Sequence, residues 1–182
     1  ALRLAGPVVL ASRPMSANGS SSASQRSVGA SISGWIIYLP LAGFLVNLAI
    51  ALIGGVDDAK VTALELGLVW LVGVNGLITG TGHMFMPAPI AQSIGWATSP
   101  FQWEVGLADL SYGVLGVMAP SFDRGFWLAT IVVFSIFMLG AAAGHARSML
   151  REHNFAPGNA GYIFWYDIIV PLALISLYIV TR

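Results

Sequence analysis

Long apolar stretches alternate with short polar connectors over most of this 182-residue chain. A helix needs about 20 mainly apolar residues to cross a bilayer, and several of the stretches reach or approach that length. They lie at residues 34–53, 61–85, 100–119, 126–151 and 162–180. We therefore expect an all-α fold in which residues 32–182 form a polytopic transmembrane helical bundle of four or five spanning helices.

The first 31 residues have a different composition from the rest of the chain. They contain Arg3, Arg13 and Arg26, no acidic residue and a serine-rich run at residues 20–24. Their short apolar piece is too brief to span a membrane. An arginine- and serine-rich start is typical of targeting peptides. We favour instead a polar, Ser-rich N-terminal tail over residues 1–31, held on a partner protein or on the membrane surface.

One face of the second apolar segment is polar and lined with glycine. Asn75, Thr79 and His83 recur every four residues, which places them on one side of a helix. Gly76 and Gly80 form a small-xxx-small pair on the neighbouring stripe, a pattern suited to close approach of two helices. This face is therefore predicted to meet protein and not lipid.

A break follows, and we expect one broken or re-entrant segment near residues 86–99. Pro87 and Pro89 are predicted to stop the second segment, because proline cannot continue a helix. A helix is predicted to restart with Ser99 as its N-cap and Gln102 completing a capping box.

The fourth apolar segment carries signals for both of its ends and for packing. Asp123 is a plausible N-cap, and Arg147 and Arg151 suit the negative end of the helix dipole. Gly140 and Gly144 form a second small-xxx-small pair, so this segment too is predicted to pack closely against another helix.

Composition narrows the class of protein further. Hydrophobic residues make up 57% of the chain and charged residues only 9%, whereas soluble domains carry about 25% charged residues. The surface must therefore be largely in contact with a lipid bilayer. The net charge is zero, so no basic field indicates a nucleic-acid partner. The absence of cysteine excludes disulfides, iron–sulfur clusters and thiolate chemistry.

The two histidines in or near apolar segments, His83 and His145, are the candidate cofactor-binding residues. Two histidines on separate helices can hold a haem iron axially, and a single buried histidine can relay a proton or ligate a metal. For His83 we weigh these roles against a structural one, a hydrogen bond to a carbonyl freed by the helix break. No metal site and no catalytic set are assigned, and the cofactor is left unknown.

Several other polar residues fall inside the apolar segments. Glu104 and Asp109 are five residues apart, so they point about 140° from each other on a helix. Asp109 needs a partner, for which we consider Arg147 or Gln102. Such groups are expected to be buried structural pairs or parts of a proton relay; they are Asn75, Thr79, Gln102, Glu104, Asp109, Arg147 and Asp167.

The stretches GTGHMFMPAPIAQSIGW, SPFQWEVGLADLSYGVLG and GHARSMLREHNFAPGNAG resemble small uncharacterised bacterial polytopic membrane proteins, which are loosely similar to DoxX-like helical bundles. The resemblance implies a bundle of usually four helices, and some relatives are linked to quinone or thiol redox systems. It assigns no role to any residue here. It also implies a bacterial inner (cytoplasmic) membrane protein.

The distribution of basic residues predicts the orientation. Whether or not residues 100–119 cross the bilayer, five of the eight lysines and arginines fall on the N-terminal side. The positive-inside rule then places the N-terminus in the cytoplasm.

Three functions remain open at this level, the last of which is the binding of a lipid or a pigment in grooves between the helices. The first is a non-catalytic accessory or structural subunit of a larger membrane protein complex, packed through glycine-lined helix faces. It rests on the small extramembrane portion, the lack of a catalytic set and the two glycine pairs. The alternative is a small redox or proton-coupled membrane protein that binds haem, quinone or a metal. It would use four ionisable residues, namely His83, Glu104, Asp109 and His145.

Overall fold

The structure is a computed structural model that describes residues 35–182. The predicted tail at residues 1–31 lies outside the described residues, as do Arg3, Arg13, Arg26 and the start of the first apolar segment. Trp35–Arg182 forms one compact unit. This unit is all-helical, as predicted, and none of its described residues is in a β-strand.

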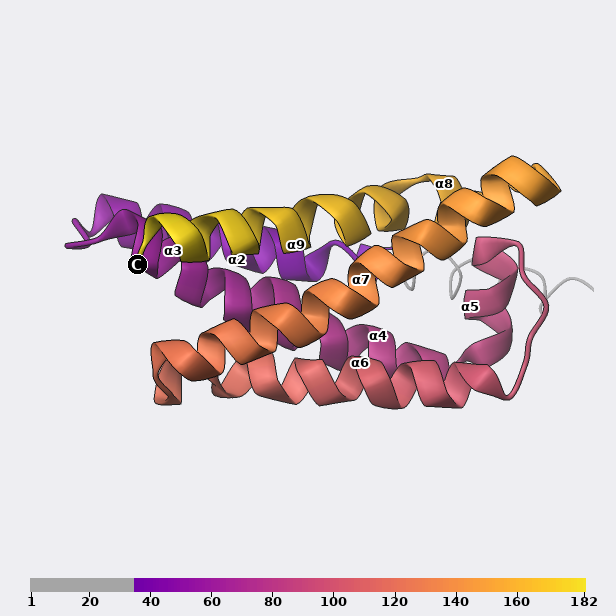
Figure 1. Cartoon of the computed structure of the whole chain (residues 1–182), viewed down its shortest axis with the longest axis horizontal. Coiled ribbons are helices and arrows are strands. Elements are labelled where there is room, and N and C mark those ends of the chain that lie inside the picture. The colour runs from indigo at the N-terminus through magenta and orange to yellow at the C-terminus, as the bar shows by residue number, and fades with distance from the viewer. Residues whose placement is uncertain (1–34) are drawn as a thin grey trace, which may run out of the picture. The chain divides into compact units, whose positions relative to one another are not determined.

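The helices run back and forth along the unit in five successive passes (Figure 1). The second pass consists of three consecutive pieces, α3, the π-helix η1 and α4, and short helices lie between some of the passes. The elements in chain order are α2 (Leu39–Ile53), α3 (Ala59–Gly67), η1 (Leu68–Val74), α4 (Asn75–Phe85), α5 (Pro87–Ile94), α6 (Phe101–Met118), η2 (Ala119–Ser121), α7 (Arg124–Glu152), α8 (Pro157–Ala160) and α9 (Tyr162–Val180).

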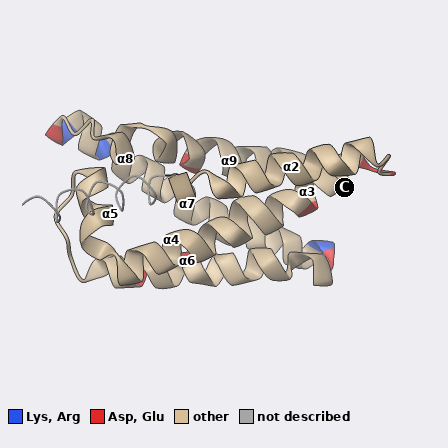
Figure 2. Ribbon diagram, turned by 180° about the vertical axis from the view of Figure 1, so that it is seen from behind, with Lys and Arg blue, Asp and Glu red and all other residues tan. Residues whose placement is uncertain are grey.

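Within residues 35–182, three helices are long and apolar enough to cross a membrane: Ala59–Phe85, Arg124–Glu152 and Pro157–Val180. They coincide with the second, fourth and fifth predicted segments. The first segment, predicted to begin at residue 34, forms a regular helix only over the 15 residues of α2. Figure 2 shows charged residues mainly near the two ends of the long helices, with few along their middle. This distribution suits helices that cross a hydrocarbon layer.

Glycines bring α6 into direct backbone contact with η1 and α4. A Cβ added at Gly76 would lie 2.6 Å from the carbonyl oxygen of Asp109, and one added at Gly113 would lie 2.9 Å from the carbonyl carbon of Gly76. Gly80 is equally constrained by Gly106 of α6. The prediction that Gly76 and Gly80 serve a close helix approach is confirmed, and the partner helix is α6.

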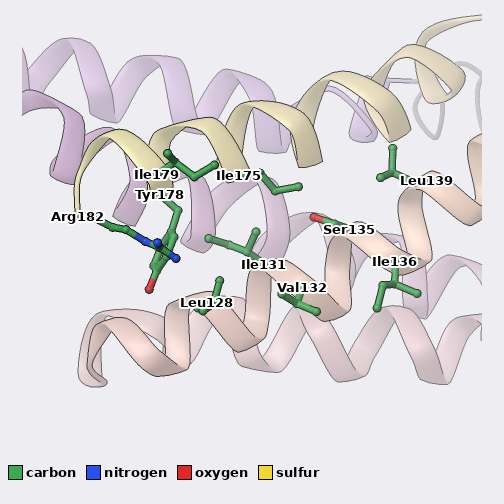
Figure 3. A pocket seen from close by; sticks show the side chains of 10 residues that line it. All are labelled: Leu128, Ile131, Val132, Ser135, Ile136, Leu139, Ile175, Tyr178, Ile179 and Arg182. Atoms are coloured by element: carbon green, nitrogen blue, oxygen red, sulfur yellow. The ribbon is translucent and has the colours of Figure 1, made fainter.

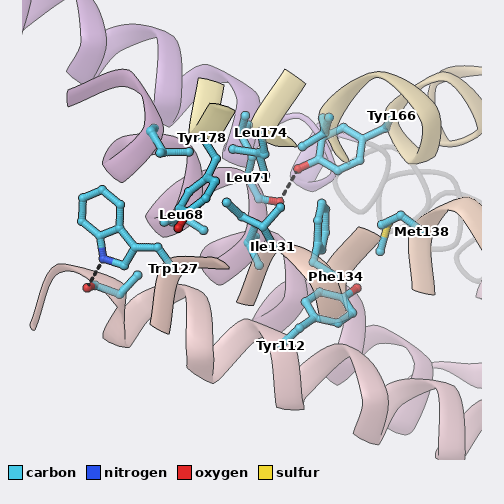
Figure 4. Packing of buried hydrophobic residues seen from close by; sticks show 14 residues of the cluster. Leu68, Leu71, Tyr112, Trp127, Ile131, Phe134, Met138, Tyr166, Leu174 and Tyr178 are labelled. Carbon is cyan, nitrogen blue, oxygen red and sulfur yellow. Dashed lines mark hydrogen bonds between the residues drawn. The ribbon is translucent and has the colours of Figure 1, made fainter. Parts of the chain in front are cut away.

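An apolar core joins η1, α6, α7 and α9 (Figure 4). Tyr112 of α6 packs edge-on against Phe134 of α7, with ring centroids 5.2 Å apart. The Tyr166 hydroxyl of α9 donates a hydrogen bond of 2.7 Å to the carbonyl of Leu71 in the π-helix. This bond links α9 directly to the backbone of the π-helix.

Two predictions about helix starts have different outcomes. The Asp123 side chain accepts a hydrogen bond from the Phe126 amide and caps α7, as expected. The predicted capping box at Ser99 and Gln102 is wrong: α6 begins with no side-chain cap, and the Gln102 amide donates to the carbonyl of Pro87 at 2.8 Å. A long-range bond to the preceding helix therefore replaces the local cap.

The predicted break is present, but its prolines act differently from expectation. The helix α4 ends at Phe85, and Pro87 then begins the short helix α5 instead of merely ending the one before it. Proline is favoured in a first helical turn because the missing N–H has no helical acceptor there. Gly95 ends α5 in the left-handed region, at φ 79°.

The glycine pair of α7 is not used within the described residues. A Cβ added at Gly140 or at Gly144 would meet no atom within 4 Å. The expected close packing at this pair is therefore absent from residues 35–182, and the stripe faces open space.

Candidate functional site

The largest group of connected polar side chains lies where α5, α7, α8 and α9 meet. At its centre is His145 of α7, of which only 5% is exposed. Its Nδ1 lies 2.7 Å from Oδ1 of Asn159 in α8, and its Nε2 lies 3.7 Å from Oδ2 of Asp167 in α9. Asn159 and Asp167 are also buried. We refer to these three residues as the His145 cluster.

The hydrogen bonds of the His145 cluster set the state of the imidazole. The Asn159 oxygen only accepts, so Nδ1 carries the hydrogen of this bond. The other nitrogen, Nε2, then faces the Asp167 carboxyl group. The two groups are 3.7 Å apart, within ion-pair distance, so the cluster brings a buried imidazole close to a buried carboxyl group.

Trp96, in the connector after α5, covers the imidazole. Its ring stacks on His145 with centroids 5.2 Å apart and an interplanar angle of 16°. The indole Nε1 donates to the Ser148 hydroxyl at 3.1 Å, and Ser148 donates to a carboxylate oxygen of Glu152 at 2.8 Å. These contacts fasten the α5–α6 connector to the C-terminal half of α7.

Asn154 completes this junction from the turn after α7. The side-chain amide of Asn154 donates to the backbone carbonyl of Ile94 at 2.9 Å. The backbone carbonyl of Asn154 accepts a hydrogen bond of 2.7 Å from the side-chain amide of Asn159. A Cβ at Gly95 would lie 2.6 Å from the Asn154 side-chain oxygen, so glycine is required there by the close approach as well as by its positive φ. The network ties connectors that lie far apart in sequence.

A second buried polar group lies between α4 and α6. Asp109 is only 2% exposed, and its Oδ1 accepts a hydrogen bond of 2.8 Å from the Tyr112 hydroxyl one turn further along α6. Thr79 uses its hydroxyl to donate to the carbonyl of Asn75 at 3.0 Å within its own helix. Asn75 is buried in the same region of α4.

The partners predicted for Asp109 are wrong. Arg147 is exposed on α7, and Gln102 bonds to the backbone of Pro87. Tyr112 donates to Asp109 instead, and the imidazole of His145 lies 3.7 Å from Asp167. A hydroxyl from the same helix can approach a buried carboxyl group without bringing a long charged side chain into the apolar interior.

The remaining candidates do not join these two groups through hydrogen bonds between side chains. Glu104 is exposed on α6. His83 is partly buried at the end of α4, and its Nδ1 has no hydrogen-bond partner among the described residues. Over residues 35–182 no group of three or more His, Cys, Asp or Glu side chains is placed to hold a metal ion. In the described part of the chain, no hydrogen bond between side chains joins any two of the four residues of the predicted redox or proton-coupled site, so their convergence stays a prediction.

Residues 33–182 match a family of unknown function, DUF6790. The chain belongs to this family. No curated protein and no solved structure matches it, and the resemblance to DoxX-like bundles finds no support. The DUF6790 match covers all the residues of both buried polar groups.

Sequence reasoning missed Asn159, Trp96 and Tyr112, which hold the predicted His145 and Asp109. Asn159 lies in the turn-rich stretch NFAPGNAG, where asparagine is expected for its turn geometry. Tyr112 does follow Asp109 by three residues, a spacing at which two helical side chains are neighbours. That spacing was the one sequence signal for the Asp109 pair.

Proposed function

We propose that this DUF6790 chain is a non-catalytic accessory subunit of a larger membrane protein complex. The observation that carries the proposal is the open glycine pair on α7. Gly140 and Gly144 meet nothing within 4 Å, whereas the glycines of α4 and α6 contact each other's backbones. A small-xxx-small stripe lets a second helix approach closely in a membrane. The face of α7 around these two glycines is the proposed contact with another subunit.

The buried polar groups support a structural role. His145, Asn159 and Asn154 bond to one another or to nearby backbone, Trp96 donates to the Ser148 hydroxyl, and Asp109 accepts from Tyr112. Satisfied polar networks of this kind stiffen a fold and fix the relation between its elements. The pocket between α7 and α9 contains none of these residues. The polar groups thus hold the helices in place, and the outer faces are left for contact.

We place the chain in a bacterial inner membrane, with four or five of the passes spanning it and the N-terminus in the cytoplasm. The passes α3–α4, α7 and α9 supply three spans of sufficient length. The 18-residue α6 packs along the whole of α4, which favours its crossing the same layer. The short helix α2 is the fifth pass.

The test is a pair of substitutions on the open stripe. Gly140→Leu together with Gly144→Leu fills the space for a second helix, and the chain should then lose its co-purifying subunits in mild detergent. Ala129→Leu, which adds the same side chain at an exposed position nearer the start of α7, is the matched control and should keep them. Thermal unfolding of both variants should stay close to that of the native chain.

Retention of all subunits by the Gly140/Gly144 variant would contradict the proposal. So would loss of the same subunits from the Ala129 control, because the effect would then not belong to the glycine stripe.

A second candidate function is proton coupling at the His145 cluster, favoured by the 3.7 Å approach of His145 to the buried Asp167. In proteoliposomes with an imposed pH gradient and an enclosed pH-sensitive dye, this function requires proton movement that Asp167→Asn abolishes. An equal dye response from native, variant and empty vesicles would leave the cluster with its structural role.

A further inference from the structure

A pocket of about 360 Å³ lies between α7 and α9, near the start of α7 and the end of α9 (Figure 3). Its size is within the range of small-molecule sites. Its walls are mostly branched aliphatic side chains: Ile131 and Val132 from α7, and Ile175 and Ile179 from α9. It is therefore shaped for a hydrocarbon chain more than for a polar solute.

The open side of the pocket is apolar as well. Val132 is 46% exposed and Ile179 is 57% exposed, and both line it. They belong to two of the helices that are long and apolar enough to cross a membrane. A molecule in this pocket would thus enter from the hydrocarbon layer along the sides of α7 and α9.

Two polar groups distinguish the pocket from an ordinary lipid-facing groove. The hydroxyl of Ser135 lines it, is almost completely buried and has no hydrogen-bond partner among the described residues. Arg182 lies at one end, with its guanidinium 5.5 Å from the centre of the Tyr178 ring. A buried donor without a partner is costly, which indicates that an acceptor belongs beside it.

Arg124 adds a second positive charge at the same end. Its guanidinium lies 5.1 Å from the centre of the Tyr178 ring and donates to the backbone carbonyl and the hydroxyl of Thr181. Neither arginine forms an ion pair with a carboxylate in the part of the chain that the structure describes. Two arginine guanidinium groups therefore lie at this end of the pocket, while its body is apolar.

We propose that this pocket binds an anionic phospholipid of the surrounding bilayer. One acyl chain lies between α7 and α9, and the phosphate lies at Arg182 within the positive field of Arg124. The Ser135 hydroxyl, deeper in the pocket, donates to an ester carbonyl, which follows the phosphate in the lipid. Basic residues where helices meet the membrane surface are a recurring site for anionic headgroups. Charge complementarity selects an anionic over a neutral lipid.

The experiment is native mass spectrometry of the full chain, released from nonionic detergent after incubation with phosphatidylglycerol or phosphatidylcholine of identical acyl chains. The native chain should retain phosphatidylglycerol at least fivefold more than phosphatidylcholine. Arg182→Gln should remove this preference, whereas Arg182→Lys, which keeps the charge, should preserve most of it.

A second pair of variants tests the pocket itself. Val132→Trp fills the pocket from an exposed position and should reduce the binding of both lipids. Ile169→Trp places the same ring on an exposed part of α9 outside the pocket and should bind them as the native chain does. Circular dichroism identifies any variant that has lost its helices.

Three outcomes would overturn the proposal. The first is equal retention of the two lipids by the native chain. The second is equal lipid binding by the Val132 and Ile169 variants. The third is displacement of phosphatidylglycerol by an equimolar neutral quinone, which would assign the pocket to a different ligand. None of them bears on the subunit contact at Gly140 and Gly144, so the two proposals fail separately.

Discussion

The hydroxyl groups of Tyr112 and Tyr162 are both buried, but in different surroundings. The Tyr112 hydroxyl donates a hydrogen bond of 2.8 Å to the buried Asp109 carboxyl group. The Tyr162 hydroxyl is buried and has no partner there. Removing a donor from a buried carboxyl group is costly, whereas removing an unpaired hydroxyl relieves a cost already present. The two residues therefore form a matched pair for measurement.

Tyr112→Phe should lower the free energy of unfolding by about 1–3 kcal/mol, the cost of leaving a buried polar group unsatisfied. Tyr162→Phe should be neutral or slightly stabilising. Chemical unfolding in detergent, followed by circular dichroism, measures both changes. Equal losses in the two variants would show that the Tyr112–Asp109 bond contributes nothing particular.

The two candidate histidines also differ in whether their ring nitrogens have partners. His145 has a hydrogen bond to Asn159, an ion-pair distance to Asp167 and a stacked Trp96. His83 has a buried nitrogen without a partner among residues 35–182. His145→Ala should therefore lower the midpoint of thermal unfolding by several degrees, since it removes all three contacts. His83→Ala should change it little, and a larger loss from His83→Ala would reverse this assignment.

At the scale of the helices, the glycine seam between α4 and α6 determines how closely they pack. Gly76→Ala should destabilise by about 1–3 kcal/mol, because its Cβ would press on the Asp109 carbonyl and the Gly113 backbone. Gly140→Ala adds the same methyl group where nothing lies within 4 Å, and should be neutral or stabilising by up to about 1 kcal/mol, the gain in helix propensity. Thermal unfolding in detergent distinguishes them, and a greater loss at Gly140 would contradict the packing described here.

Helix positions were largely predictable from the sequence, because a run of apolar residues is a local property. The last segment was predicted at residues 162–180, and α9 spans Tyr162–Val180. The π-helix η1 was not foreseen, since Leu68–Val74 contains no residue pattern that separates it from an α-helix. The predicted capping box at Ser99 is wrong, because the Gln102 side chain donates to the backbone carbonyl of Pro87, which is distant in sequence.

The polar pairs were the least predictable feature of the site. Glu104 and Arg147 were expected to be buried because of their place in apolar segments but are exposed, whereas the burial of Asp109 and Asp167, expected for the same reason, is observed. The identity of their partners depends on which helices meet, and one sequence gives no direct information on that. His145 and Asp167 come from α7 and α9, and Asn159 comes from the short helix between them.

At the scale of the whole molecule, the number of crossings determines which connectors share a side of the membrane. The chain contains no cysteine, so single cysteines can be introduced without background. If α6 crosses the bilayer, Asp57→Cys and Phe122→Cys should react from one side with a membrane-impermeant maleimide, and Thr98→Cys and His153→Cys from the other. Reaction of Thr98→Cys and Phe122→Cys from the same side would show that α6 does not cross.

The helical unit is held together by the His145 cluster and the Asp109–Tyr112 bond, and the Gly140–Gly144 face of α7 is the proposed contact with another subunit. The most direct measurement is purification of the native chain in mild detergent, with the mass of the eluted particle and its absorption spectrum recorded together. We predict a colourless protein that elutes in a particle containing other membrane subunits. A lone chain, or one that carries a visible absorption band, would contradict the accessory-subunit proposal. It would favour cofactor binding at His83 and His145 instead.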